Sequence, residues 1–182
     1  MGVKCFILSS LKDLIIFTVL SLDASSQINS LAYQNGKDIN GKWWCLYKQN
    51  GVSMSYTYDF KNWIFFENVN SGENVCVLKD DNQYVMFHSP QNGIGIMRSD
   101  NFKDWSPFGG LITLGQKQWD WAKGRITAGA VVDLRDIKGI EKYIMFFHGS
   151  GPKKESEGDF DKNSSIGIAW SNDLVNWGWP NE

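Results

Sequence analysis

The sequence repeats one seven-residue motif three times: TYDFKNW at 57–63, SDNFKDW at 99–105 and SNDLVNW at 171–177. The shared form is Ser/Thr, any residue, Asp/Asn, Phe/Leu, any residue, Asn/Asp and Trp. A motif that recurs in this way indicates that one supersecondary unit is repeated along the chain. The Ser/Thr and Asp/Asn side chains can bind their own backbone, so each copy predicts a sharp bend.

Each copy follows short apolar segments that are rich in aromatic and β-branched residues. Such segments are too short for typical helices and predict buried strands. The segment nearest the start of each unit is WWCLY at 43–47, YVMF at 84–87 and YIMFF at 143–147. Glycine-marked turns then lead to further short strands, at 93–97 and 165–170 in the second and third units.

A unit of three or four short strands cannot bury both of its faces alone and must stack on sister units, which predicts an all-β propeller. Trp63 and Trp105 are 42 residues apart, about one blade, whereas Trp105 and Trp177 are 72 residues apart. The longer spacing predicts two insertions, at 108–124 and 149–163, and long loops of this kind are usually functional. An immunoglobulin-like sandwich, the competing fold, does not explain the repeated motif.

Composition restricts the class of protein further. The 182 residues suffice for one compact domain, and the 14% aromatic content with nine Trp argues against disorder. A net charge of −2 without a basic block argues against a nucleic-acid partner. No run of eighteen apolar residues is present, so no membrane-spanning helix is expected.

Residues 1–26 read as a signal peptide or a disordered leader, and residues 27–182 as the propeller domain. The apolar segment 14–20 has the length of a signal-peptide core, although Lys12 and Asp13 interrupt the apolar run before it. A cleaved leader predicts a secreted or periplasmic protein, and an uncleaved one a cytoplasmic protein. Cys45 and Cys76 read as buried thiols, with a disulfide as the alternative.

The order of strands in a blade predicts where a site would lie. If the innermost strands cover 73–79 and 126–134 and successive strands are antiparallel, their starts meet the ends of the second strands on one face. A set of polar residues then converges there: Lys48, Glu73, Asn74, His88, Arg125, Thr127 and His148.

Four stretches of the chain resemble the five-bladed propeller glycosidases, most closely glycoside hydrolase family 43 and its relatives, which act on arabinans, xylans, fructans or galactans. They are 41–63, 72–96, WDWAKGRITAG at 119–129, and YIMFFHGSGP with SSIGIAWSNDLVNW between 143 and 177. The resemblance covers about residues 40–180 and implies an all-β, partial five-bladed β-propeller. It also implies hydrolysis by two or three acidic residues at the starts of the inner strands.

That chemistry needs one carboxylic acid to protonate the leaving oxygen and one carboxylate to activate water. Glu73 is our candidate for the acid, with an exposed turn glutamate as the alternative. The partner candidates are Asp38, in the region 31–40 that should hold the first inner strand, and Asp120 in the first insertion.

Other residues read as substrate-binding groups. The guanidinium of Arg125 suits sugar hydroxyls or a substrate carboxylate, with a structural ion pair as the alternative. His88 and His148 read as donors or as strand-end histidines held by hydrogen bonds. Trp119 and Trp121 read as sugar-stacking platforms, although blade packing is the more common role for such residues.

Three motif copies are fewer than a five-bladed ring requires. The sequence therefore predicts a truncated glycosidase or a ring that closes by oligomerising through open blade faces. A non-catalytic carbohydrate-binding propeller and a protein-interaction propeller are the competing functions. No cofactor is expected; the resemblance allows a structural calcium, but no cluster of ligands demands one.

Overall fold

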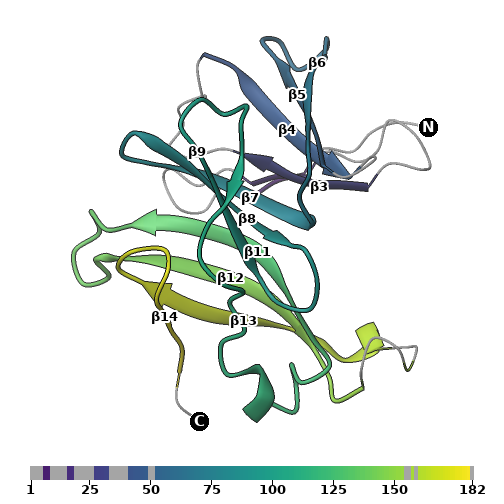
Figure 1. The fold of residues 1–182 in the computed structure, drawn as a ribbon, viewed down its shortest axis with the longest axis vertical. Coiled ribbons are helices and arrows are strands. Elements are labelled where there is room, and N and C mark those ends of the chain that lie inside the picture. Colours follow the sequence, from purple (N-terminus) through teal and green to yellow (C-terminus); the bar gives the residue numbers. More distant parts are fainter. Residues whose placement is uncertain are drawn as a thin grey trace.

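The computed structural model describes residues 6–8, 16–18, 27–32, 41–48, 52–153, 157 and 160–180. Three four-stranded antiparallel sheets follow one another along this part of the chain, and each has its strands in sequence order (Figure 1). Blade 1 contains β3 (Gln27–Ala32), β4 (Trp43–Lys48), β5 (Val52–Thr57) and β6 (Ile64–Val69). Blade 2 contains β7 (Glu73–Asp80), β8 (Gln83–Ser89), β9 (Gly95–Ser99) and β10 (Ser106–Pro107). Blade 3 contains β11 (Arg125–Leu134), β12 (Lys142–Ser150), β13 (Ser164–Ser171) and β14 (Trp177–Gly178).

The first strand of each blade is the innermost one. Strand β7 contacts both β3 and β11, so the three blades fan out from a common centre (Figure 1). The prediction of an all-β partial propeller is confirmed, and the only helical segments in the described residues are short 3₁₀ turns, such as Gln116–Gln118 and Phe160–Asn163. The inner strands predicted at 73–79 and 126–134 are confirmed as β7 and β11.

The inner strand of blade 1 differs from the sequence-based prediction. The resemblance to the propeller glycosidases places it within 31–40, but β3 covers Gln27–Ala32 and pairs Gln27 with Lys48. The start of this strand therefore lies several residues earlier in the chain than the resemblance suggests. Asp38 lies outside the described residues.

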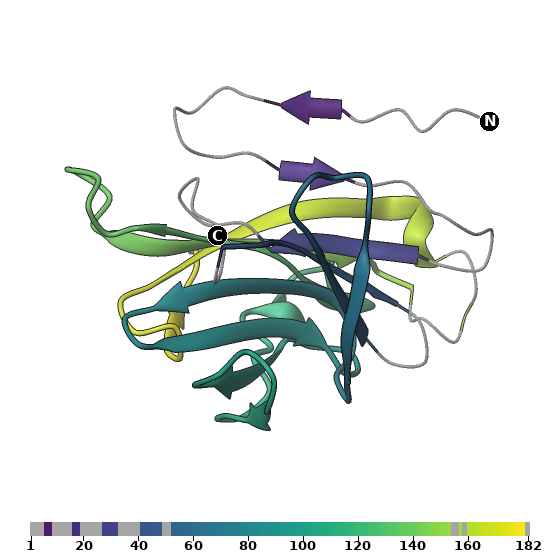
Figure 2. The same cartoon turned by 90° about the horizontal axis from the view of Figure 1, so that it is seen from above.

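Two further strands, β1 (Phe6–Leu8) and β2 (Ile16–Thr18), pair with each other in the segment that the sequence predicts to be a leader. They lie to one side of the three blades, and β2 contacts β3 (Figure 2). The cleavage of this segment stays a prediction. In the described part of the chain we find no helix with the length and apolar character needed to cross a membrane.

The repeated motif forms the same turn in all three blades. In blade 3 the Ser171 hydroxyl accepts hydrogen bonds from the backbone N–H groups of Asp173 and Leu174, at 3.1 and 2.9 Å. Asp173 Oδ1 accepts from the N–H groups of Val175 and Asn176, and Asp173 Oδ2 from the Asn176 side chain, at 2.7–2.9 Å. The side-chain bond from Asn176 and then these backbone bonds hold the pKa of Asp173 well below its usual range.

The fourth motif residue has a left-handed backbone conformation in every copy, with φ of 57° at Phe60, 63° at Phe102 and 64° at Leu174. This conformation is costly for residues other than glycine. The hydrogen bonds of the turn hold it in place, and packing offsets the cost in blades 2 and 3, because Phe102 and Leu174 are buried.

The interfaces between blades form the core. One apolar cluster joins blades 1 and 2, where the ring of Phe102 lies 4.5 Å from that of Trp44. The other joins blades 2 and 3, where Trp177 packs edge-on to Phe87 at 5.7 Å and Leu174 is buried beside them. Motif residues of one blade therefore complete the core of the blade before it.

Hydrogen bonds and an ion pair connect blade 2 to blade 3 at both ends of the sheets. At one end the Asn92 side chain accepts from the N–H of Ile126 at 3.0 Å and donates to the carbonyl of Gly124 at 2.9 Å. At the other end the Tyr143 hydroxyl donates to Asp80, which also pairs with Arg135 at 3.2 Å. Between these ends the free thiol of Cys76 accepts from the N–H of Val131, and burial raises its pKa. Cys45 is also free, as the sequence indicated.

We expect Asp173→Ala to lower the free energy of unfolding by about 1–2 kcal/mol, because two backbone N–H groups of the turn lose their acceptor. Urea denaturation measures the change. Asp136→Ala, at an exposed position in the β11–β12 loop, is the control and should change stability by less than about 0.5 kcal/mol. Equal losses in the two variants would show that the turn is not a stabilising element.

Candidate functional site

Three charged residues from three different blades meet where the inner strands begin. Glu73 starts β7, Arg125 starts β11, and Lys48 ends β4 opposite the start of β3. Glu73 Oε2 accepts a hydrogen bond from Lys48 Nζ at 2.8 Å, and Glu73 Oε1 lies 4.0 Å from an Arg125 guanidinium nitrogen. We call these three residues the mouth, and the structure brings them together as the strand order predicted.

The mouth is partly enclosed but open to solvent. The Glu73 side chain is 33% exposed, Arg125 is more buried, and Lys48 is half exposed. The carboxylate can therefore reach a bound molecule, while the two cations fix the position of the carboxylate. Each cation sits on a neighbouring blade, so the geometry of the mouth depends on how the blades pack.

Backbone geometry at the start of β7 aims Glu73 into the mouth. A β-bulge lies between Glu73 and Cys76, and Asn74 within it has a φ of 54°. The residue before Glu73 must be glycine, because a Cβ on Gly72 would lie 2.0 Å from the carbonyl oxygen of Ser89. Bulges of this kind re-aim a side chain at the edge of a sheet.

His88 supports this backbone through its ring nitrogen Nδ1. Its Nδ1 accepts a hydrogen bond from the N–H of Gly72 at 2.8 Å, so the proton of the neutral ring lies on Nε2. The side chain is buried, and loss of solvation lowers its pKa to about 4. Of the two roles that the sequence left open for His88, the contacts favour the strand-end histidine held by hydrogen bonds.

Thr127 and His148 lie opposite each other on β11 and β12, near the same end of blade 3. The Thr127 hydroxyl is 3.5 Å from His148 Nδ1, a long contact between a buried and a half-buried side chain. Thr127 lies two residues after Arg125 on β11, and His148 lies on β12. Their predicted role in substrate binding stays a prediction.

In the insertion at 108–124 the tryptophan side chains pack against blade 3, whereas the one acidic side chain points into solvent. Trp119 is buried and stacks on Trp121 and Phe147 at 5.3 and 5.9 Å. Trp121 is half-buried and leaves no room for a side chain at Gly149. The carboxylate of Asp120 is almost fully exposed and pairs with Lys123 at 3.0 Å.

Two residues that the sequence reasoning did not single out also shape this end of the molecule. Ser89, paired in register with Glu73, accepts a hydrogen bond from the N–H of Ala128 at 2.8 Å. Asn92 accepts a hydrogen bond from the Gln116 side chain as well as from Ile126. Both sit in SPQNG at 89–93, where the turn signal was visible but the contacts with blade 3 were not.

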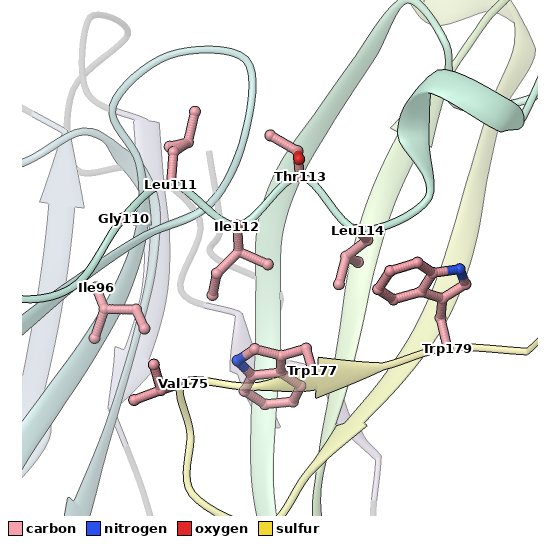
Figure 3. A pocket seen from close by; sticks show the side chains of 9 residues that line it. All are labelled: Ile96, Gly110, Leu111, Ile112, Thr113, Leu114, Val175, Trp177 and Trp179. Carbon is pink, nitrogen blue, oxygen red and sulfur yellow. The ribbon is translucent and has the colours of Figure 1, made fainter.

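A pocket of about 350 Å³ lies away from the mouth, at the outer strand of blade 3 (Figure 3). It is lined by residues of β9, of the insertion and of the chain around β14: Ile96, Gly110, Leu111, Ile112, Thr113, Leu114, Val175, Trp177 and Trp179. No acidic or basic side chain is among them, so this pocket has no group for acid–base chemistry. Among the described residues, no three His, Cys, Asp or Glu side chains gather in a way that could hold a metal ion.

No model of a protein family matches this sequence, and no curated protein matches it. Three similar solved structures are enzymes that act on carbohydrates. Sucrose-6-phosphate hydrolase from Lactobacillus gasseri is 11% identical over 85% of this chain and 33% of its own, with a TM-score of 0.56. A GH32 β-fructofuranosidase from Bombyx mori is 12% identical over 93% of this chain and 40% of its own, with a TM-score of 0.57.

The third structure comes from the GH130 family of mannoside phosphorylases, which contains glycoside hydrolases that target β-1,2-mannosidic linkages in Candida mannan. It is 19% identical over 86% of this chain and 49% of its own, with a TM-score of 0.55. The three structures belong with propeller glycosidases in general and do not single out family 43.

We expect a pH-dependent loss of stability that His88 causes. The unfolded chain protonates this histidine below about pH 6.5, whereas the folded chain does so only below about pH 4. The unfolded state therefore binds more protons between these values, and stability falls as the pH drops from 6.5 to 4. Urea denaturation across this range should show a shallower pH dependence for His88→Gln than for the parent protein. If His148→Gln, the matched control, flattens the curve and His88→Gln does not, the assignment is wrong.

The chain shares the propeller fold of the three similar solved structures described above, which are glycoside hydrolases, and it spans a third to a half of their length.

Proposed function

We propose that the mouth binds a carbohydrate and that the protein hydrolyses a glycosidic bond with Glu73 as an acid–base carboxylate. One observation carries the proposal: Glu73 starts the inner strand of the middle blade and is held between Lys48 of blade 1 and Arg125 of blade 3. Three blades thus position one carboxylate at the shared end of the inner strands. The fold shared with enzymes that cleave fructosides and β-1,2-mannosides supports the same reading.

The residues of the mouth have complementary roles in this proposal. As general acid, Glu73 acts in its protonated form and gives that proton to the leaving oxygen. The carboxylate that results is the form that accepts the hydrogen bond from Lys48 in the structure. Arg125 presents several N–H donors in a fixed plane, which suits the hydroxyl groups of a sugar ring. Gly72 and His88 hold the backbone that aims Glu73, so they are positioning residues.

A second carboxylate must activate the attacking water, about 6.5–9.5 Å from the first in inverting enzymes. Asp120 and Asp38 are the sequence candidates for it. Asp120 lies in the insertion whose backbone approaches Gly151 just beyond β12, the strand whose last residue pairs with Arg125. For Asp120 to act, its carboxylate has to leave Lys123 and turn toward the mouth when substrate binds.

A non-catalytic carbohydrate-binding propeller is the second candidate function. It is favoured by the exposed position of Asp120 and its pairing with Lys123, because hydrolysis of a glycoside requires two carboxylates. Such a protein would bind glycans at the mouth without turnover.

We expect release of reducing sugar from at least one member of a panel of fructan, arabinan, xylan, galactan and β-1,2-mannan oligosaccharides. Glu73→Gln should lower kcat by about 10²–10⁴-fold, because the amide cannot transfer a proton. Glu67→Gln is the matched control, since Glu67 lies on the outer strand β6 and its carboxylate contacts Lys103 at 4.0 Å and the N–H of Asn68 at 3.1 Å.

The outcomes separate the two functions. Equal activity in the two variants would contradict the role of Glu73. Saturable glycan binding by calorimetry without any turnover, lost in Arg125→Ala, would favour the binding protein. Neither turnover nor binding with any glycan of the panel would contradict both.

A further inference from the structure

The pocket between blades 2 and 3 occupies a repeated position in the fold, a groove where the outer strand of one blade meets the motif turn of the next. The register of the sheets shows the repeat. Val69 pairs with Val52 in blade 1, and Ile112 bridges to Ile94 in blade 2. Because Val52 and Ile94 both lie five residues before a motif copy, Val69 and Ile112 occupy equivalent positions. Each of the two lines a groove.

The two equivalent grooves differ in their chemistry. The groove between blades 1 and 2 has a volume of about 280 Å³ and is lined mainly by charged and amide side chains: Glu67, Asn68, Asn70, Lys103 and Asp104. In the pocket between blades 2 and 3, Val175 takes the motif position of Lys103, and no charged side chain lines it. An uncharged pocket favours a neutral ligand over an ionised one.

Two tryptophan rings form one wall of this pocket. Trp177 and Trp179 lie two positions apart at the outer edge of blade 3, so their side chains point to the same side of the strand. Figure 3 shows Ile112 and Leu114 pointing toward this segment from the opposite wall. Trp177 is buried, whereas Trp179 is half-buried, so Trp179 offers the larger surface to a ligand.

Contacts outside the pocket fix both rings. Trp177 Nε1 donates a hydrogen bond to the carbonyl oxygen of Leu174 at 3.1 Å, and Trp179 packs edge-on to Trp119 with ring centroids 6.0 Å apart. Residue 115 must be small beside them, since a Cβ on Gly115 would lie 2.8 Å from Trp179 Nε1. The aromatic wall is therefore in place before a ligand binds, which lowers the entropic cost of binding.

Hydrogen-bonding groups lie on the other wall. Both backbone groups of Ile112 bond to Ile94, which holds the segment 110–114 against β9. Within the described residues, the backbone N–H and C=O of Leu111 form no hydrogen bond, and the hydroxyl of Thr113 is exposed. These groups include donors and acceptors, as the hydroxyls of a sugar do. A purely apolar ligand that covered them would leave them without partners.

We propose that this pocket binds a neutral sugar unit, stacked on Trp179 and hydrogen-bonded to the segment 111–113. The choice of a sugar rests on the proposed function, because a protein that acts on glycans at the mouth encounters them there. The pocket volume of about 350 Å³ is at the lower end of the range for small-molecule sites, about 300–1,000 Å³, which suits a short piece of a glycan. A second contact away from the mouth would raise the effective concentration of a long glycan at the mouth.

Nuclear magnetic resonance of the isotope-labelled chain tests the proposal with the fructan, arabinan, xylan, galactan and β-1,2-mannan oligosaccharides. We expect at least one of them to shift the indole N–H signal of Trp179 in a saturable manner, and the signal lost in Trp179→Phe identifies it. The shift should persist in Arg125→Ala, which weakens binding at the mouth. This titration of the parent protein does not depend on the folding of any variant.

A blocking variant gives the second measurement. A Cβ on Gly110 meets nothing within 4 Å, so Gly110→Trp has room for a bulky side chain that fills the pocket. It should raise the Kd measured at Trp179 about tenfold or more. Lys138→Trp adds the same side chain at an exposed position of the β11–β12 loop and is the matched control, with a Kd within about twofold of the parent value.

The outcomes separate this inference from the proposed function. Turnover that Glu73→Gln abolishes, without any shift at Trp179, would overturn the pocket as a sugar site and leave the mouth intact. A shift that Gly110→Trp removes and Arg125→Ala retains, in a protein without turnover, would support the pocket alone. An equal shift with cyclohexanol, a ring of similar size that has a single hydroxyl, would overturn the assignment of a sugar. A shift that Gly110→Trp leaves unchanged would overturn binding in the pocket.

Discussion

The packing of one blade's motif turn on the preceding blade is the contact on which the rest of the structure depends. Each four-stranded sheet has two apolar faces and cannot shield both by itself. The left-handed fourth residue of the motif carries Phe102 or Leu174 into the core of the neighbour, and the hydrogen bonds of the turn hold that residue in place. Because the same contact recurs, the angle between successive blades and the shared centre of their inner strands follow from it.

The mouth is a consequence of this stacking. Lys48, Glu73 and Arg125 are far apart in sequence and meet only because three inner strands start at the same end. Its geometry is set at two levels: Gly72 and His88 aim the carboxylate within blade 2, while Ser89 and Asn92 fix blade 3 beside it. A change in blade packing far from the mouth would therefore alter the distances between its charges.

Much of this arrangement was predictable from the sequence, because the repeated motif is a local signal with a local cause. The motif indicated repeated blades, and the usual strand order of a blade then located β7 and β11. The antiparallel order placed Glu73, Arg125 and Lys48 at one end. The start of β3 was not predictable, since no motif copy precedes it and the resemblance to the glycosidases points to a strand some residues later. The hydrogen-bond partner of His88 and the contacts of Asn92 escaped prediction, because they depend on residues 16 to 34 positions away.

The motif turns pair one acid with one amide in every blade, but not in the same order. Asp59 faces Asn62 and Asp173 faces Asn176, whereas Asn101 faces Asp104. Two acids at these positions would repel each other at hydrogen-bonding distance, while two amides could still bond. During evolution, substitutions can therefore convert one order into the other through an intermediate with two amides, but not through an intermediate with two acids. The two positions should vary together among blades that share this turn, and their covariation would identify such blades where the aromatic residues have changed.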